Sequence, residues 1–217
     1  MSGIAVFPFN PWQENTYLIY DANGIAAVID PGCYSREEQQ ELRSFMEAQS
    51  LQPLHLLNTH CHIDHVLGNA FVADTWQLDL AMHQGEIPVL KAVDTYADSM
   101  GIQYQRSPDA TLLLNEGDVL EVGSIRLEVL FTPGHSPASI CFYNRAEGYV
   151  IGGDVLFLDS IGRTDLPGGD MDTLLDSIRN KIFPLPDDTI VYPGHGPSTT
   201  VGREKKHNPF LNGRYQP

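Results

Sequence analysis

The run Thr59-His60-Cys61-His62-Ile63-Asp64-His65 constrains this chain more than any other segment. It holds three of the eight histidines in the 217-residue sequence, together with an aspartate. The apolar residues 54–57 come directly before it and predict a short buried strand, so the metal-ligand types fall on the loop at its end. Neutral imidazoles and a carboxylate suit zinc, and also iron or manganese. Because neighbouring residues on a turning loop cannot easily all reach one ion, we expect two adjacent metals.

Three more ligand types follow predicted strands later in the chain. They are His135, Asp154 and His195. Both histidines come directly after Pro-Gly, which forces a turn, and two glycines precede the aspartate, which lets the backbone come close to whatever the carboxylate binds. Since strand ends form a rigid edge, we expect these residues to meet the first loop there.

The predicted ligands are sufficient for two ions that share a carboxylate and a hydroxide. One ion takes His60, His62 and His135, and the other takes Asp64, His65 and His195, with Asp154 as the bridge. Such ions make hydroxide available at neutral pH and polarise a carbonyl, so the bridging hydroxide is the expected nucleophile. Thioester hydrolysis is an easy target because a thiolate leaves readily. We assign the catalytic roles to Asp64, Asp154 and His195.

The charge balance excludes some classes of partner. The chain has 28 acidic and 13 basic side chains, a formal net charge of −15, which opposes binding to nucleic acid or to an anionic membrane. Four basic groups lie in the last fifteen residues: Arg203, Lys205, Lys206 and Arg214. They form either a solvated tail or a local attractor for an anionic substrate, with Lys205 as the candidate substrate contact.

The cysteines and the apolar pattern indicate a cytoplasmic protein. Cys33, Cys61 and Cys141 form no C-x-x-C pair, which favours a reducing compartment. Cys61 is expected to pack inward while its neighbours face the metals. The N-terminus has no basic region typical of a secretory signal, and no run of 18 apolar residues occurs.

The element pattern predicts an α/β protein of one domain, residues 1–217. Strands are expected at 4–9, 16–20, 25–30, 54–58, 78–82, 125–131, 139–143, 149–152 and 189–192. Helices are expected at 36–50, from 65 to 73, and after Asp170 or Asp172. The weakly patterned segment 84–110, interrupted by Pro88, is expected to vary or to form a mobile cover. The order of elements repeats, which suggests two similar halves with sheets inside and helices outside.

Four motifs together resemble the metallo-β-lactamase superfamily. They are His60-Cys61-His62-Ile63-Asp64-His65, Thr132-Pro133-Gly134-His135, Gly153-Asp154 and Pro193-Gly194-His195-Gly196-Pro197. The resemblance covers about residues 4–212. It implies an αββα four-layer sandwich with a binuclear site at one edge, and it gives Asp30 a supporting role behind the ligands.

Within that superfamily the chain resembles the glyoxalase II (hydroxyacylglutathione hydrolase) branch. The resemblance rests on Gln13-Glu14-Asn15-Thr16-Tyr17, Gly194-His195-Gly196-Pro197, and Glu204-Lys205 followed by Asn208-Pro209-Phe210. Because the chain stops at Pro217, we expect the short type without an additional helical domain. The implied reaction converts S-D-lactoylglutathione to D-lactate and glutathione with two divalent ions, most simply zinc. The oligomeric state stays open.

Two alternatives remain at this point. Ile161-Gly162-Arg163-Thr164-Asp165 also resembles persulfide dioxygenases, which use one iron, although Pro-Gly-His-Gly-Pro around His195 favours the hydrolase. A lactonase of the same superfamily is also open. Arg163 either binds a substrate carboxylate or forms a salt bridge with Asp165 or Asp170.

Overall fold

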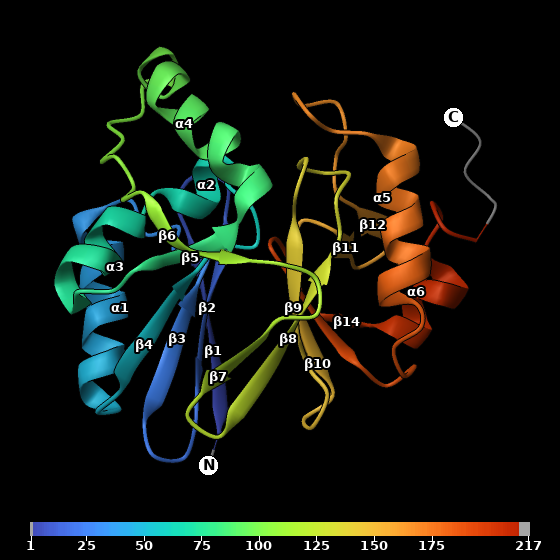
Figure 1. Ribbon diagram of the computed structural model, residues 1–217, viewed down its shortest axis with the longest axis horizontal. Helices are drawn as coiled ribbons and strands as arrows, with labels where there is room; N and C mark the ends of the chain where they lie inside the picture. Colours follow the sequence, from blue (N-terminus) through green and yellow to red (C-terminus); the bar gives the residue numbers. More distant parts are fainter. Residues whose placement is uncertain (1, 213–217) are drawn as a thin grey trace.

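Two six-stranded sheets pack face to face in the computed structural model, which describes residues 2–212, and helices cover both outer faces (Figure 1). The first sheet, in spatial order, contains β1 (Gly3–Phe9), β2 (Glu14–Tyr20), β3 (Ile25–Ile29), β4 (Gln52–Leu57), β5 (Leu80–His83) and β6 (Ala110–Leu114). The second contains β14 (Thr199–Thr200), β13 (Ile190–Pro193), β10 (Tyr149–Gly153), β9 (Ile140–Asn144), β8 (Ile125–Phe131) and β7 (Val119–Val122). A small hairpin joins β11 (Leu156–Phe157) to β12 (Ser160–Ile161).

The helices divide between the two outer faces. On the first sheet lie α1 (Arg36–Ala48), α2 (Ile63–Val66), α3 (Asn69–Trp76) and α4 (Ile87–Tyr96), with 3₁₀ turns at Gln84–Glu86 and Asp98–Met100 (Figure 1). On the second lie α5 (Met171–Ser177), a π-helical turn (Ile178–Ile182) and α6 (Val201–His207). The predicted αββα sandwich is therefore confirmed.

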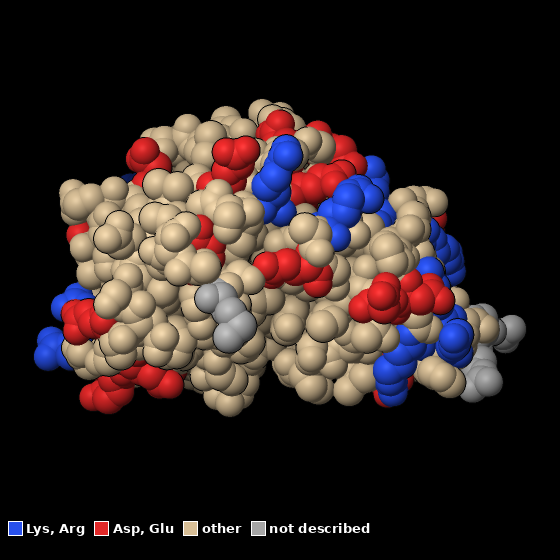
Figure 2. Space-filling model, turned by 90° about the horizontal axis from the view of Figure 1, so that it is seen from below, with Lys and Arg blue, Asp and Glu red and all other residues tan. Residues whose placement is uncertain are grey.

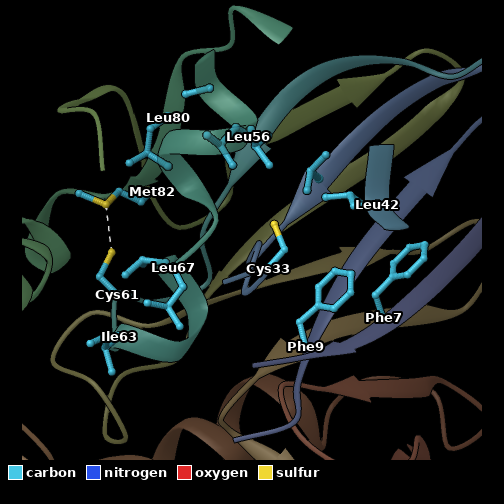
Figure 3. Close-up of a cluster of buried hydrophobic side chains, with 14 of the residues drawn as sticks. Phe7, Phe9, Cys33, Leu42, Leu56, Cys61, Ile63, Leu67, Leu80 and Met82 are labelled. Atoms are coloured by element: carbon cyan, nitrogen blue, oxygen red, sulfur yellow. Dashed lines mark hydrogen bonds between the residues drawn. The ribbon is translucent and has the colours of Figure 1, made fainter. Parts of the chain in front are cut away.

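Three apolar layers hold this sandwich together. Between the sheets, Ile19 and Ile29 of the first pack with Leu127 and Phe142 of the second. Outside the first sheet lies the layer drawn in Figure 3, where Leu42 of α1 approaches Phe7 and Phe9. Outside the second sheet, the buried side chains of α5 and the π-helical turn pack on β9 and β10. Burial of apolar surface in all three layers makes both sheets rigid supports for their loops.

Local sequence signals explain the ends of the first elements. The predicted β2–β3 hairpin is confirmed, and Asp21 accepts from the backbone N–H of Asn23 and Ile25 at 2.8 and 3.0 Å, as a turn aspartate does. A capping box starts α1, because Ser35 Oγ accepts from Glu38 N and Glu38 accepts from Ser35 N. The helix ends at Ala48, slightly before the predicted residue 50.

The predicted boundaries were wrong in the segment after the histidine run. The single helix expected from 65 to 73 is two helices, α2 and α3, separated at Leu67 and Gly68. Gly68 has no room for a Cβ, which would lie 2.7 Å from the carbonyl oxygen of Pro31. The strand expected at 78–82 begins later, at Leu80. Pro88 does not interrupt a helix, since it stands in the first turn of α4, where the missing N–H costs nothing.

Charged groups of both signs mix on the surface. On the face shown in Figure 2, lysines and arginines lie among aspartates and glutamates and form no continuous basic area. Within residues 2–212, none of the helices has the length and apolar character needed to cross a bilayer.

Candidate metal centre

Asp30 holds the histidine-bearing loop in place from the end of the neighbouring strand. Parallel pairing of β3 with β4 sets Ile29 beside Leu57, so the two strands end together. Asp30 Oδ1 accepts from Thr59 N at 2.7 Å, and its Oδ2 accepts from Thr59 Oγ1 at 2.5 Å and lies 3.2 Å from His65 Nδ1. Its φ of +49° is unusual for a residue other than glycine. These contacts place Asp30 behind the histidines.

The structure brings all seven sequence-predicted ligand types together. Six of them form two groups, each with its ligand atoms within 4.8 Å of one another: His60, His62 and His135, and then Asp64, His65 and His195. A third combination of Asp30 with His60 and His65 meets the same distance limit, but the oxygens of Asp30 already accept from Thr59. The first two groups contain the residues that the sequence analysis assigned to each ion, and that assignment stays a prediction.

Asp154 lies between the two groups. Its Oδ1 is 3.5 Å from His65 Nε2, while its Oδ2 is 3.4 Å from His135 Nε2 and 3.6 Å from His195 Nε2. Burial by itself raises the pKa of Asp154, but the surrounding His65, His135 and His195 lower it overall. Asp154 is therefore an ionised carboxylate whose Oδ2 lies near both groups, while its Oδ1 lies near His65 of the second group.

The imidazole rings are oriented by bonds on the side away from the cluster. His135 Nδ1 donates to the carbonyl oxygen of Arg163 at 2.7 Å, and His195 Nδ1 donates to that of Trp12 at 3.1 Å. A carbonyl accepts only, so both Nδ1 atoms carry a proton, and in the neutral ring Nε2 is then the atom that can bind a metal. This is the arrangement that orients histidine ligands of metals.

Several buried polar atoms in the cluster have no hydrogen-bond partner. They include His60 Nε2, His65 Nε2 and Asp154 Oδ1. His62 Nδ1 lies only 2.8 Å from His135 Nε2, the nitrogen that presents a lone pair. Burial lowers the pKa of His62 to about 4, and that of His60 well below its usual value, so both are neutral at pH 7. Unpaired buried atoms are costly, and cations between the converging lone pairs would satisfy them, so the residues fit two divalent ions.

Two of the three segments that supported the glyoxalase II resemblance contact each other. Asn15 N donates to Gly194 O at 2.7 Å, and its side-chain amide donates to the carbonyls of Pro193 at 3.0 Å and Gly196 at 2.8 Å. Tyr17 Oη donates to Pro193 O at 2.6 Å. The beginning of β2 thus fixes the loop that carries His195.

Glu86 was not identified from the sequence, yet it joins two ligand-bearing loops. Its fully buried carboxylate accepts from Cys61 N at 2.9 Å on one side. On the other side it accepts from Ala138 N at 2.8 Å and from Ser136 Oγ at 2.7 and 2.8 Å. Burial raises the pKa of Glu86, although these donors act against the rise. The only sequence signal was an acidic residue in an otherwise apolar, weakly patterned stretch.

Glu14 is a second buried carboxylate beside the cluster. Its Oε2 accepts from Thr16 Oγ1 at 3.0 Å, whereas Oε1 has no partner and lies 3.8 Å from His65 Nδ1. Burial raises the pKa of Glu14 well above its usual value. Cys61, by contrast, packs inward as expected, with Sγ 3.2 Å from Met82 Sδ (Figure 3).

A cavity of about 1040 Å³ opens in front of the cluster. His62, Asp64, His135, Asp154 and His195 lie in its floor. Its size is at the upper end of the range of small-molecule sites. The predicted catalytic residues therefore all face a space that can hold a substrate.

The two predicted substrate contacts have different surroundings. Arg163 lines the cavity, and its guanidinium forms two 2.7 Å bonds with Asp165, so the salt bridge considered from the sequence is present. Lys205 is not among the residues that line this cavity, and its Nζ lies 2.6 Å from Asp187 Oδ1. Arg203 pairs with Asp159 in the same region, and Arg214 lies outside the described residues.

A four-layer αββα fold with histidines and aspartates gathered at its sheet edge defines a class of metal-dependent enzymes. The family model described as "Metallo-beta-lactamase superfamily" matches residues 9–195. The chain belongs to this superfamily, and it is a metallo-hydrolase.

Relatives agree on the family and differ in their names. A probable metallo-hydrolase (YqgX) of Bacillus subtilis is 39% identical over 95% of this chain and 96% of its own length. The hydroxyacylglutathione hydrolase GloC of Haemophilus influenzae is 37% identical over 97% of this chain and 99% of its own.

Two crystal structures are also similar over nearly the whole chain. The BLEG-1 B3 metallo-β-lactamase is 40% identical, with a TM-score of 0.89, and the match covers 97% of this chain and all of that one. A protein crystallised in a di-iron-bound form is 37% identical, with a TM-score of 0.85, and the match covers 95% of this chain and all of that one.

Proposed function

We propose that this protein is a binuclear metal-dependent hydrolase of acyl-glutathione-type thioesters, with S-D-lactoylglutathione as the reference substrate. The observation that carries the proposal is the convergence of six ligand types, in two groups of three, around Asp154 at the floor of a cavity. The relative named hydroxyacylglutathione hydrolase supports the glutathione part of the proposal.

The roles of the residues follow from their positions. His60, His62 and His135 would hold one ion, Asp64, His65 and His195 would hold the other, and Asp154 lies between the two groups. When bound, such ions supply a nucleophilic water at neutral pH and polarise the thioester carbonyl. The two carboxylates would offset part of the positive charge of the ions, and Asp64 Oδ2 lies 3.2 Å from His195 Nε2. Zinc suits this donor set, and a similar protein crystallised with two irons supports iron as the other candidate.

Thiol release from S-D-lactoylglutathione under strict anaerobiosis tests the proposal. The purified protein is loaded with zinc, and its metal content is measured alongside the rate. We expect two ions per chain and rapid release in the parent protein. Asp154→Ala should lose at least about a hundredfold in kcat/KM and should bind less metal. Asp79→Asn, an exposed carboxylate outside the cavity, is the matched control and should behave like the parent.

The same experiment separates the alternatives. Failure to release thiol with two ions present would reject this substrate. Activity that requires oxygen and a single iron, and that survives loss of His65, would instead support persulfide oxidation. Release of acid from a lactone but not from the thioester would support a lactonase. The three cysteines, all free and buried, support our proposal that the enzyme works in the cytoplasm.

A further inference from the structure

One wall of the cavity is built from apolar side chains of α4. Pro88, Val89, Ala92 and Tyr96 face the cavity from the helix, and Met100 follows it. Because residues four apart lie above one another on a helix, Pro88, Ala92 and Tyr96 form one continuous strip. The hydroxyl of Tyr96 is the only side-chain polar group in this wall, and burial raises its pKa to about 12, so it is neutral.

The helix that carries this wall is firmly attached. Leu90 and Val93, on its other face, are buried in the outer layer of the first sheet. Glu86, directly before the helix, is bonded to both ligand-bearing loops. In Figure 1, α4 stands at the upper end of the molecule near α2. The wall is therefore a preformed surface, and a ligand does not have to order it.

The side of the cavity formed by β11, β12 and the loop after them contains apolar side chains, such as Phe157 and Leu166, and two polar ones. Ser160 and Arg163 line it from β12 and the loop that follows. Arg163 is the only lysine or arginine among the lining residues of the described chain, and Asp165 already engages it. A carboxylate placed against α4 would have no cation to pair with, and such burial is costly.

We propose, on the basis of the thioester hydrolysis proposed above, that the α4 wall is a subsite for an extended apolar acyl group. The occupant is an alkyl chain or an aromatic ring attached to the thioester carbonyl. The thiol half then lies towards Ser160 and Arg163. A lactoyl group is small and polar, and it leaves most of the wall uncovered. The enzyme accordingly prefers thioesters of apolar acids to the lactoyl thioester.

Binding of non-hydrolysable thioethers tests the subsite independently of turnover. Affinities of S-methyl-, S-butyl- and S-hexylglutathione for the zinc-loaded protein are measured by calorimetry. Each buried methylene should tighten binding about fourfold, so S-hexylglutathione should bind at least about thirtyfold more tightly than S-methylglutathione even if part of the chain stays in solvent. Equal affinities for the three would overturn the proposal.

A negative charge introduced into the α4 wall tests whether the alkyl chain binds there. Ala92→Asp should reduce the ratio of the hexyl to the methyl affinity at least tenfold. Ala48→Asp makes the same exchange at an exposed alanine of α1 that does not line the cavity, and it should leave the ratio unchanged. An unchanged ratio in Ala92→Asp would show that the chain binds elsewhere and would also overturn the proposal.

Rates of thioester hydrolysis test the proposed subsite and the proposed function separately. Thiol release is compared for S-lactoyl-, S-hexanoyl- and S-benzoylglutathione with the same metal-loaded protein. Higher kcat/KM for the two apolar substrates supports both proposals. Hydrolysis with no preference would overturn the apolar subsite and leave thioester hydrolysis standing. Absence of hydrolysis together with the expected thioether affinities would reject the reaction and support the subsite.

Discussion

Replacing Glu86 tests whether one buried carboxylate holds two ligand-bearing loops together. Glu86→Ala leaves three buried donors without an acceptor: Cys61 N, Ala138 N and Ser136 Oγ. Each such loss costs about 1–3 kcal/mol, and removal of a carboxylate that burial itself disfavours returns part of this. We therefore expect a loss of about 3–5 kcal/mol in the free energy of unfolding. Glu86→Gln keeps the volume and one acceptor oxygen, so roughly half that loss is expected.

The measurement is urea unfolding of the metal-free protein in the presence of a chelator, which removes any contribution from bound ions. Glu47→Ala, at an exposed glutamate of α1, is the control and should change the free energy by less than about 0.5 kcal/mol. A loss below about 1 kcal/mol in Glu86→Ala would refute the reasoning. In the metal-loaded protein, both Glu86 variants should also bind zinc about 10–100-fold more weakly, because the loops that carry His62 and His135 lose a common partner.

Three further outcomes are expected. Ser35→Ala removes the cap of α1 and should lower the free energy of unfolding by about 1 kcal/mol in urea, whereas no change would contradict the capping box. Bonds from Thr173 hold the pKa of Asp170 below its ordinary value of 3.8, so its carboxylate stabilises the fold above that pH. In urea titrations, the parent should have a higher free energy of unfolding than Asp170→Asn, and this difference should shrink as the pH falls below 3.8. A difference that does not change with pH would refute the role of the Asp170 carboxylate. Asp30→Ala should weaken zinc about 10–100-fold in chelator competition, and unchanged affinity would exclude a role behind His65.

The fold and the ligand cluster could be anticipated because their signals are local. Alternating apolar residues marked the strands, and ligand types stood directly after them, as at His135 and His195. A strand that pairs within a sheet fixes where its end points, so the ligand types had to gather at one edge. The error at α2 and α3 has a different cause, because Gly68 separates the two helices where its backbone approaches that of Pro31, far away in the sequence.

The remaining features depend on contacts between distant segments, which no local pattern encodes. Glu86 accepts from residues that lie 25 and 52 positions away. Whether Lys205 reached the cavity depended on how α6 packs, and the partner it meets is Asp187. The sequence did not reveal the apolar wall of α4 for a related reason. A helix that is apolar towards both the core and a cavity lacks the sharp periodicity of an ordinary surface helix, which made residues 84–110 look weakly patterned.

The bonds between Asn15 and the loop at 193–196 can form only late in synthesis, because the two segments lie far apart in the sequence. Synthesis begins at the N-terminus, so β2 leaves the ribosome long before its partners Pro193 and Gly194 exist. Throughout that interval the inner face of the first sheet, including Ile19 and Ile29, has no second sheet to cover it. Until β8 and β9 emerge, the nascent chain exposes apolar strands that are prone to aggregate. We therefore expect slower translation to prolong this exposure, whatever the stability of the finished enzyme.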